Sequence, residues 1–264
     1  MKDLKVAVIQ TTLQWEDPAA NYDHIDKLVQ QVGSIDILVL PEMFTTGFSM
    51  NTGQIAEVHH DKMTTLEMMR RWAGKVDGII CGSVSVQDGN FFNRLYWVRP
   101  DGSYSFYDKR HTFSFAREDR HYERGTKLLI EEWRGWRILP LICYDLRFPV
   151  WSRNKLVNDQ ANYDLMIYVA NWPEARREPW MKLLPARAIE NQVYVAACNR
   201  VGTDSKEIAY SGDSMLLNAK GEIITQAGHG VEEVIIAEFS RAELEEFRRK
   251  FPVLHDADSF EVNI

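Results

Sequence analysis

The chain has 264 residues but only three cysteines, no long apolar run and no excess of positive charge. Cys81, Cys143 and Cys198 are odd in number and far apart, so we expect neither a disulfide framework nor a CxxC redox pair. No spacing of Cys and His resembles a zinc site, and no apolar segment approaches the ~20 residues that span a bilayer. The sequence therefore predicts no metal site and no membrane partner.

The net charge and the first residues indicate the class of partner and the cellular compartment of the protein. A formal net charge of −7 argues against a nucleic-acid partner, because proteins that bind nucleic acids carry basic surfaces. The opening residues, "MKDLKVAVIQ", run into a short strand-like stretch and lack the apolar core of a signal peptide. Together with the unpaired cysteines, they predict a cytoplasmic protein.

Several common catalytic motifs are missing. The sequence contains no GxGxxG, no Walker loop, no HExxH and no GxSxG elbow, so neither a phosphate-binding loop nor a serine hydrolase is indicated. His59 and His60 are adjacent, and adjacent residues do not face one point on a regular element. We therefore do not expect them to hold a metal ion.

Short runs rich in β-branched and aromatic residues predict strands, and amphipathic stretches between some of them predict helices. The predicted strands cover 5–10, 35–41, 78–86, 92–100, 136–144, 164–171, 193–199, 214–218, 222–226 and 232–239, and the predicted helices cover 21–32, 61–76, 180–191 and 240–250. This order favours a layered α/β fold with a mixed sheet. Ser240 is a candidate N-cap, and Pro185 is expected to kink or split its helix.

One stretch, "ILPLICYDLRFPVWSRN" at 138–154, places a thiol at the end of an apolar strand. Cys143 ends the apolar run, and Asp145 and Arg147 follow at once. A cysteine of the core needs no charged neighbours, whereas a nucleophile does. For Asp145 we expect a local ion pair with Arg147 that orders the turn.

Two other strand ends also present a charged residue. "LVLPEMF" presents Glu42, and "YSFYDKRH" presents Lys109. In α/β sheets, ligands bind beyond the carboxyl ends of strands, so an acid, a cation and a thiol would meet in one pocket if these ends are neighbours. Each residue alone is more often the polar edge of a sheet.

With these residues in view, the chain resembles the nitrilase, or carbon–nitrogen hydrolase, superfamily over essentially its whole length. The similarity lies in "VLPEMFTTGF", "FYDKRHTF", "LICYDLRFP" and "ARAIENQVYVAACNRVG", and "YVANWP" is similar to the bacterial omega-amidase branch. The resemblance implies a four-layer αββα sandwich formed by one domain of residues 1–264, with 251–264 as a C-terminal tail. It also implies a homodimer paired through helices.

The resemblance implies roles as well. Cys143 would be the nucleophile, Glu42 the general base and Lys109 the cation that stabilises the tetrahedral intermediate. Family members often carry a second glutamate seven residues before a glycine, and Glu118 stands seven before Gly125 in "AREDRHYERG". Its neighbour Asp119 leaves two candidates for this second acid.

Substrate-binding roles are expected for Arg147, Tyr144 and Trp172. Arg147 follows the nucleophile by four residues, and its guanidinium suits a carboxylate; pairing with Asp145 or capping a helix remains the alternative. The backbone N–H of Tyr144 is a candidate second donor to the oxyanion. Trp172 follows the strand-like "MIYVAN" and is expected to line the pocket.

The function that follows is a cysteine-dependent amidase that needs no cofactor and acts on a small-molecule amide. The expected substrate is the ω-amide of a 2-oxo acid, such as 2-oxoglutaramate or 2-oxosuccinamate, hydrolysed through a thioester. Two alternatives stay open. One is another activity of the superfamily, such as an amidase of deaminated glutathione, a carbamoylase or a nitrilase. The other is a catalytically silent binding protein, which the complete set of Glu42, Lys109 and Cys143 makes less favoured.

Overall fold

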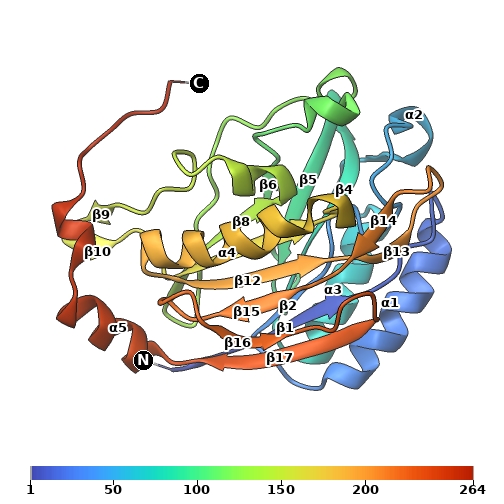
Figure 1. The fold of residues 1–264 in the computed structure, drawn as a ribbon. Helices are drawn as coiled ribbons and strands as arrows, with labels where there is room; N and C mark the ends of the chain where they lie inside the picture. Colours follow the sequence, from blue (N-terminus) through green and yellow to red (C-terminus); the bar gives the residue numbers. More distant parts are fainter. Residues whose placement is uncertain (1, 264) are drawn as a thin grey trace.

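The computed structural model describes residues 2–263 and consists of two packed β-sheets covered by helices (Figure 1). The first sheet has seven strands and the second has six. The first contains β1 (Leu4–Gln10), β2 (Ile37–Val39), β3 (Glu57–Val58), β4 (Ile79–Asp88), β5 (Asn90–Val98), β6 (Tyr104–Asp108) and β17 (Glu233–Phe239). The second contains β7 (Glu131–Trp133), β8 (Trp136–Ile142), β11 (Leu165–Ala170), β12 (Tyr194–Asn199), β15 (Met215–Leu217) and β16 (Ile223–Gln226).

Both sheets mix parallel and antiparallel neighbours. In the first sheet β1, β2 and β4 are parallel, whereas β17, β5 and β6 join it antiparallel. In the second sheet β11 runs parallel to β8 and β12. Two short hairpins lie outside them: β9 (Leu156–Val157) with β10 (Gln160–Ala161), and β13 (Val201–Thr203) with β14 (Ala209–Ser211).

Helices cover the outer faces of the sheets. Residues 2–263 form five α-helices: α1 (Pro18–Val32), α2 (Thr52–Ile55), α3 (Thr64–Val76), α4 (Arg177–Asn191) and α5 (Arg241–Lys250). The 3₁₀ turns in the same residues are η1 (Ser114–Ala116), η2 (Glu118–Arg120), η3 (Cys143–Arg147), η4 (Glu174–Arg176) and η5 (Val253–Asp256). In Figure 1, α4 lies on one side of the strands and α1 and α3 lie on the other. This is the four-layer αββα arrangement that the sequence resemblance implied.

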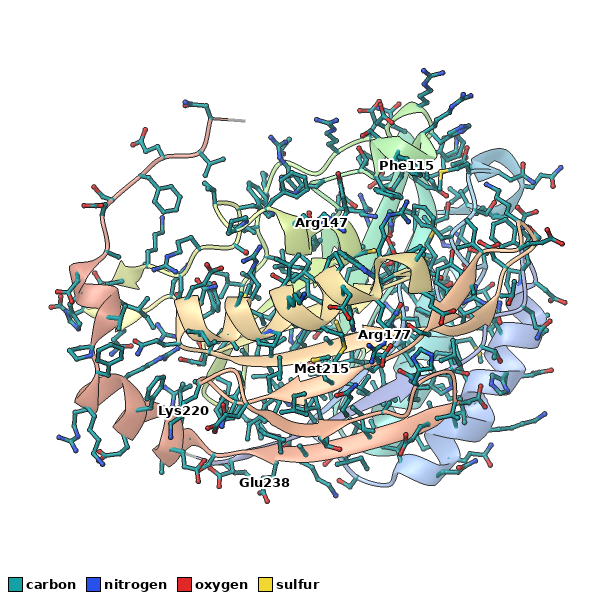
Figure 2. The ribbon with its side chains drawn as sticks, viewed as in Figure 1. Phe115, Arg147, Arg177, Met215, Lys220 and Glu238 are labelled. Atoms are coloured by element: carbon teal, nitrogen blue, oxygen red, sulfur yellow. The ribbon has the colours of Figure 1, made fainter. Side chains whose placement is uncertain are left out.

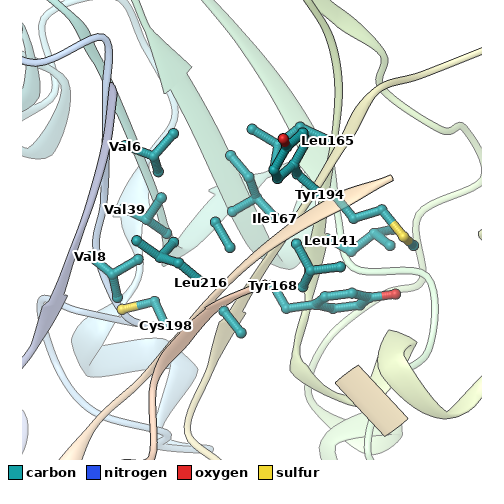
Figure 3. Close-up of a cluster of buried hydrophobic side chains, with 14 of the residues drawn as sticks. Val6, Val8, Val39, Leu141, Leu165, Ile167, Tyr168, Tyr194, Cys198 and Leu216 are labelled. Carbon is teal, nitrogen blue, oxygen red and sulfur yellow. The ribbon is translucent and has the colours of Figure 1, made fainter. Parts of the chain in front are cut away.

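The alternation of side chains along the strands divides the core between the layers. On β1, Val6 and Val8 face the space between the sheets, where they meet Val39, Ile167 and Leu216 (Figure 3). The intervening residues of the same strand, Ala7 and Ile9, belong instead to the cluster under α1 and α3. A strand covered on both faces reads as a continuous apolar run, which is why "VAVI" carries no alternation.

The first turns of α1 and α5 are capped by side chains that the sequence expectations did not name. Helix α1 begins at Pro18 rather than at residue 21, because the Asp17 side chain caps it by accepting from the Ala20 N–H at 3.0 Å. Ser240 is the N-cap residue of α5, but its side chain makes no cap bond; Asp3 accepts from the Arg241 N–H at 2.8 Å instead.

Pro185 neither splits nor ends its helix, since α4 runs unbroken from Arg177 to Asn191. The helix is held against the second sheet by its buried residues Trp180, Leu184 and Ala188, which belong to the main core cluster. Packing therefore outweighs the hydrogen bond that proline removes from the Met181 carbonyl.

Candidate active site

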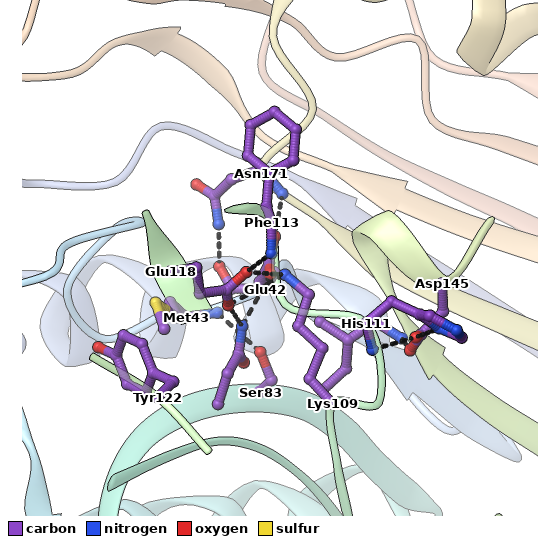
Figure 4. Close-up of polar contacts among 12 residues, drawn as sticks. Glu42, Met43, Ser83, Lys109, His111, Phe113, Glu118, Tyr122, Asp145 and Asn171 are labelled. Atoms are coloured by element: carbon purple, nitrogen blue, oxygen red, sulfur yellow. Dashed lines mark hydrogen bonds and ion pairs between the residues drawn. The ribbon is translucent and has the colours of Figure 1, made fainter. Parts of the chain in front are cut away.

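The ends of three strands bring Glu42, Lys109 and Cys143 to one place. Glu42 follows β2, Lys109 follows β6 and Cys143 follows β8, so the first two come from one sheet and the third from the other. The sheets meet there, because the Asn171 N–H at the end of β11 donates to Glu42 Oε2 at 2.8 Å (Figure 4). The three strand ends singled out in the sequence are therefore neighbours.

An acid–base cluster lies at the centre of this site, and it is closed to water. The Lys109 Nζ donates to Glu42 Oε1 at 2.7 Å and to Glu118 Oε1 and Oε2 at 3.1 and 2.9 Å. All three side chains are 0% exposed. Asp119, the rival to Glu118, points to solvent, so the structure brings Glu118 and not Asp119 into the cluster.

Local structure fixes the two carboxylates. After Glu42 the chain turns at Met43, whose φ is +44° and whose N–H donates to the Ser83 hydroxyl at 3.0 Å. Glu118 begins η2, and its Oε2 accepts from the Phe113 N–H at 2.5 Å. Neither carboxylate can rotate away from Lys109 without leaving a buried polar group unpaired.

Cys143 sits at a strained junction between β8 and η3. Its φ is +43°, in the left-handed region that costs a non-glycine residue roughly 1–2 kcal/mol. The residue is 9% exposed and lines a cavity. The next N–H, of Tyr144, lies in the first turn of η3, where no carbonyl of that turn can accept from it.

Burial and the neighbouring charges set the protonation of the cluster. Burial, and then the charge of Glu42, raise the pKa of the Cys143 thiol well above its ordinary value, although Lys109 opposes them. Burial also raises the pKa of Glu118, again against the opposing charge of Lys109. For Lys109, burial lowers the pKa, but Glu118 and Glu42 outweigh it and raise the pKa overall. The resting site therefore holds an ammonium and a neutral thiol.

Two asparagines of the site were missed from the sequence. Asn93 on β5 donates from Nδ2 to Glu42 Oε1 at 2.8 Å and to Glu118 Oε1 at 3.1 Å. Asn171 donates from its backbone to Glu42 Oε2 and from Nδ2 to the Glu42 carbonyl at 2.5 Å. Asn171 follows a strand just as Glu42 and Cys143 do, so the same criterion could have found it. Asn93 stands inside β5 between Phe92 and Arg94, and nothing in the local sequence marks it.

The expected ion pair between Asp145 and Arg147 is not formed. The buried Asp145 carboxylate accepts from the Tyr107 hydroxyl at 2.8 Å, from His111 Nδ1 at 2.8 Å, and from the N–H groups of Ile142 and His111. These four donors occupy both carboxylate oxygens of Asp145, and Arg147 forms no ion pair with it. The guanidinium of Arg147 stacks instead over the Trp172 ring, 4.9 Å from its centre.

A cavity of about 250 Å³ opens above the thiol. Its lining includes all three expected substrate-binding residues, Arg147, Tyr144 and Trp172, together with Lys109 and Cys143. Arg147 lies at the same end of the molecule as Phe115 of the loop that carries Glu118 (Figure 2). Among residues 2–263, Arg147 has no hydrogen bond or ion pair to a side chain, so its guanidinium is free to meet a ligand.

Residues 2–263 hold neither a metal site nor a membrane-spanning helix. No three side chains of His, Cys, Asp or Glu there are grouped as metal ligands would be, and His59 Nδ1 is bonded to the Tyr96 hydroxyl at 2.7 Å. None of the helices of this part is long and apolar enough to cross a membrane.

Comparison with known proteins gives consistent matches over the whole chain. Residues 5–249 match the carbon–nitrogen hydrolase family. The chain is 48% identical to omega-amidase YafV of Yersinia enterocolitica, covering 98% of this chain and 99% of that protein, and 31% identical to a 2-oxoglutaramate amidase of Bacillus subtilis, covering 95% and 96%. Among solved structures, XC1258 of Xanthomonas campestris, a CN-hydrolase superfamily protein, is 40% identical with a TM-score of 0.96 and full coverage of both chains.

Proposed function

This chain belongs to the carbon–nitrogen hydrolase family, and we propose that it is an omega-amidase that hydrolyses the ω-amide of small 2-oxo acids to a dicarboxylate and ammonia. The preferred substrates are 2-oxoglutaramate and 2-oxosuccinamate. The 48% identity to an omega-amidase over nearly the full length supports the class of reaction. The scheme uses no cofactor, and it places the enzyme in the cytoplasm, where thiols stay reduced.

One observation carries the proposal: the Arg147 guanidinium, which pairs with no side chain among residues 2–263, lines the same cavity as the Cys143 thiol and Lys109, the cation of the buried Glu–Lys–Glu cluster. Arg147 lines that cavity beside Trp172, and Lys109 and Cys143 form its floor. A substrate with a carboxylate at one end and an amide at the other can therefore span from the guanidinium to the thiol. Arginine binds a carboxylate through two parallel hydrogen bonds, which orients the substrate as well as holding it.

Acylation starts from a neutral thiol. The Cys143 S–H proton passes to Glu42 as sulfur attacks the amide carbon, and the carbonyl electron pair moves to oxygen. Lys109 and the Tyr144 N–H donate to this oxyanion in a largely buried site, where such bonds are stronger than in water. Moving the proton during attack avoids forming a thiolate beside the Glu42 charge.

Release of ammonia and hydrolysis complete the cycle. The intermediate collapses as the C–N bond breaks, and protonated Glu42 returns its proton to the leaving nitrogen. Water then adds to the thioester and gives a proton to Glu42. As the C–S bond breaks, Glu42 returns this proton to sulfur, which regenerates the thiol and releases the carboxylic acid. Glu118 holds Lys109 and Phe113 in place throughout, through its hydrogen bonds to both.

A panel of amides tests the proposed substrate, with ammonia as the measured product except for deaminated glutathione, whose amide releases cysteinylglycine. It contains 2-oxoglutaramate, 2-oxosuccinamate, a carbamoyl amino acid and deaminated glutathione, with Cys143→Ala as the blank. We expect the two 2-oxo acid amides to have the highest kcat/KM. A higher value for either of the other compounds would move the assignment to another activity of the family, and no hydrolysis of any of them would remove it.

A further inference from the structure

Behind the nucleophile, one buried carboxylate joins the two loops that carry Cys143 and Lys109. Asp145 is 0% exposed and lies two residues after Cys143. Its Oδ2 accepts from the Ile142 N–H at 3.1 Å, one residue before the nucleophile. The same carboxylate therefore holds the chain on both sides of the strained Cys143 backbone.

The other donors to Asp145 come from both sides of Lys109. Tyr107, two residues before the lysine, donates its hydroxyl to Oδ2 at 2.8 Å. His111, two residues after it, donates its N–H to Oδ1 at 3.0 Å and lies with Nδ1 at 2.8 Å from the same oxygen. Because a carboxylate can only accept, Nδ1 carries the proton in this contact.

The donors are themselves fixed by their surroundings. The Tyr107 hydroxyl accepts from Trp151 Nε1 at 3.0 Å and from the Arg110 N–H at 3.2 Å. The His111 ring stacks on Phe148, with 3.8 Å between ring centres and 5° between planes. Phe148 directly follows η3, the turn that begins at Cys143. The His111 ring therefore packs against the segment that carries the nucleophile.

We propose that Asp145, with Tyr107 and His111, positions the Cys143 thiol against the Lys109 ammonium without touching substrate. The thiol and the cation approach from different sheets, and no other carboxylate among residues 2–263 bonds to both of their loops. A displacement of about 1 Å in such a pair can lower a rate by about 100-fold. The inference uses the proposed amidase reaction as its readout.

The central experiment compares two buried aspartates. Asp145→Asn keeps the size of the side chain but leaves one acceptor oxygen for four donors, and we expect kcat to fall at least 100-fold while KM changes less than about 3-fold. Asp164→Asn is the matched control. Asp164 is also 0% exposed and holds Arg241 and Arg248, but at the opposite end of β11. Its variant should lose stability and keep kcat per folded molecule.

If Asp145→Asn folds poorly, a second pair of variants tests the single hydrogen bond between His111 Nδ1 and Asp145 Oδ1. His111→Asn keeps a side-chain N–H near the position of Nδ1, and His111→Phe keeps the stacking on Phe148 without that donor. We expect His111→Asn to stay within about 3-fold of wild-type kcat and His111→Phe to lose about 10-fold. Equal kcat for the two His111 variants, or unchanged kcat in folded Asp145→Asn, would overturn the positioning role.

The assay also separates this inference from the proposed function. Any amide that the wild-type protein hydrolyses can serve as substrate, because Asp145 is proposed to position the Cys143 thiol and the Lys109 ammonium, which act on every amide. The pocket for the substrate carboxylate is not involved. A wild-type protein inactive on 2-oxoglutaramate but active on another amide would contradict the proposed substrate, and the variants would still decide the role of Asp145.

Discussion

The protonation of Cys143 is the residue-scale feature that most shapes the chemistry. The charge of Lys109 lowers the pKa of the thiol, but burial and the Glu42 charge outweigh it and raise that pKa overall. We therefore predict that the rate of Cys143 alkylation by iodoacetamide rises steadily with pH above neutrality. In Glu42→Gln the carboxylate charge is gone, so the pKa of Cys143 falls and alkylation is faster at each pH.

The measurement is the mass of the alkylated protein followed over time. Cys143→Ala is the control, because Cys81 and Cys198 are fully buried and burial raises the pKa of both. A wild-type rate that is already at its plateau at neutral pH would mean that the resting thiol is ionised. Transfer of the Cys143 S–H proton to Glu42 during attack would then be ruled out.

Arg147 provides the second residue-scale prediction. Arg147→Lys keeps the charge but loses the planar fork, so kcat/KM for 2-oxoglutaramate should fall about 10- to 150-fold, as expected for roughly 1.5–3 kcal/mol of charge-assisted binding. The loss should appear mainly in KM, and an uncharged short amide should be little affected. Steady-state ammonia release on both substrates makes the comparison. Equal losses on the two would make Arg147 a structural residue.

Among single residues, the sequence identified the site residues that follow strands, but it did not predict the hydrogen-bond partners of the buried polar groups. Glu42, Lys109 and Cys143 could be grouped because the carboxyl ends of strands in a layered fold share an edge. The partners of Asp145 could not, because Tyr107 and His111 are more than 30 residues away and nothing local distinguishes them from Arg147. Asn93 was missed for the same reason.

At the scale of the element, α4 contains the clearest conflict between local preference and packing. Pro185 leaves the Met181 carbonyl without its helical N–H donor, yet the helix continues. Pro185→Ala should raise the free energy of unfolding by about 2 kcal/mol, because the gain in helix propensity exceeds the added entropy of the unfolded chain. Urea unfolding gives the value.

Pro173→Ala is the matched control for that measurement. Pro173 precedes η4 with a φ of −65°, the angle that proline prefers, so its replacement should lower stability by about 0.4–1 kcal/mol. A destabilised Pro185→Ala would show that the ring itself contributes packing that the helix needs.

The elements were predicted well where burial alone decides them, and less well at their ends. The short, continuous apolar runs form strands because a strand between two layers must be apolar on both faces. The 3₁₀ turns η2 and η3, which carry Glu118 and Cys143, could not be predicted, since contacts distant in sequence create them. The cap of α5 likewise depends on Asp3, at the other end of the chain.

At the scale of the whole molecule, the association of two copies stays a prediction. We expect a homodimer paired through the face beside α4, where Val150 is 57% exposed and shares a hollow with Glu190 and Phe260. Sedimentation velocity should give twice the chain mass, and Val150→Glu should give monomers. Val58→Glu, at a similarly exposed position on β3, should remain dimeric. A monomeric wild-type protein would contradict the pairing.

The covalent amidase reaction is the central claim, and the mass of protein quenched in acid during turnover of 2-oxoglutaramate tests it most directly. Because acid preserves a thioester, we predict a fraction of protein that carries the 2-oxoglutaryl group on the peptide containing Cys143, both in the wild-type protein and in Glu118→Gln, which keeps Cys143 and Glu42. Ammonia released with no adduct in either protein, or an adduct on Cys81 or Cys198, would contradict the account.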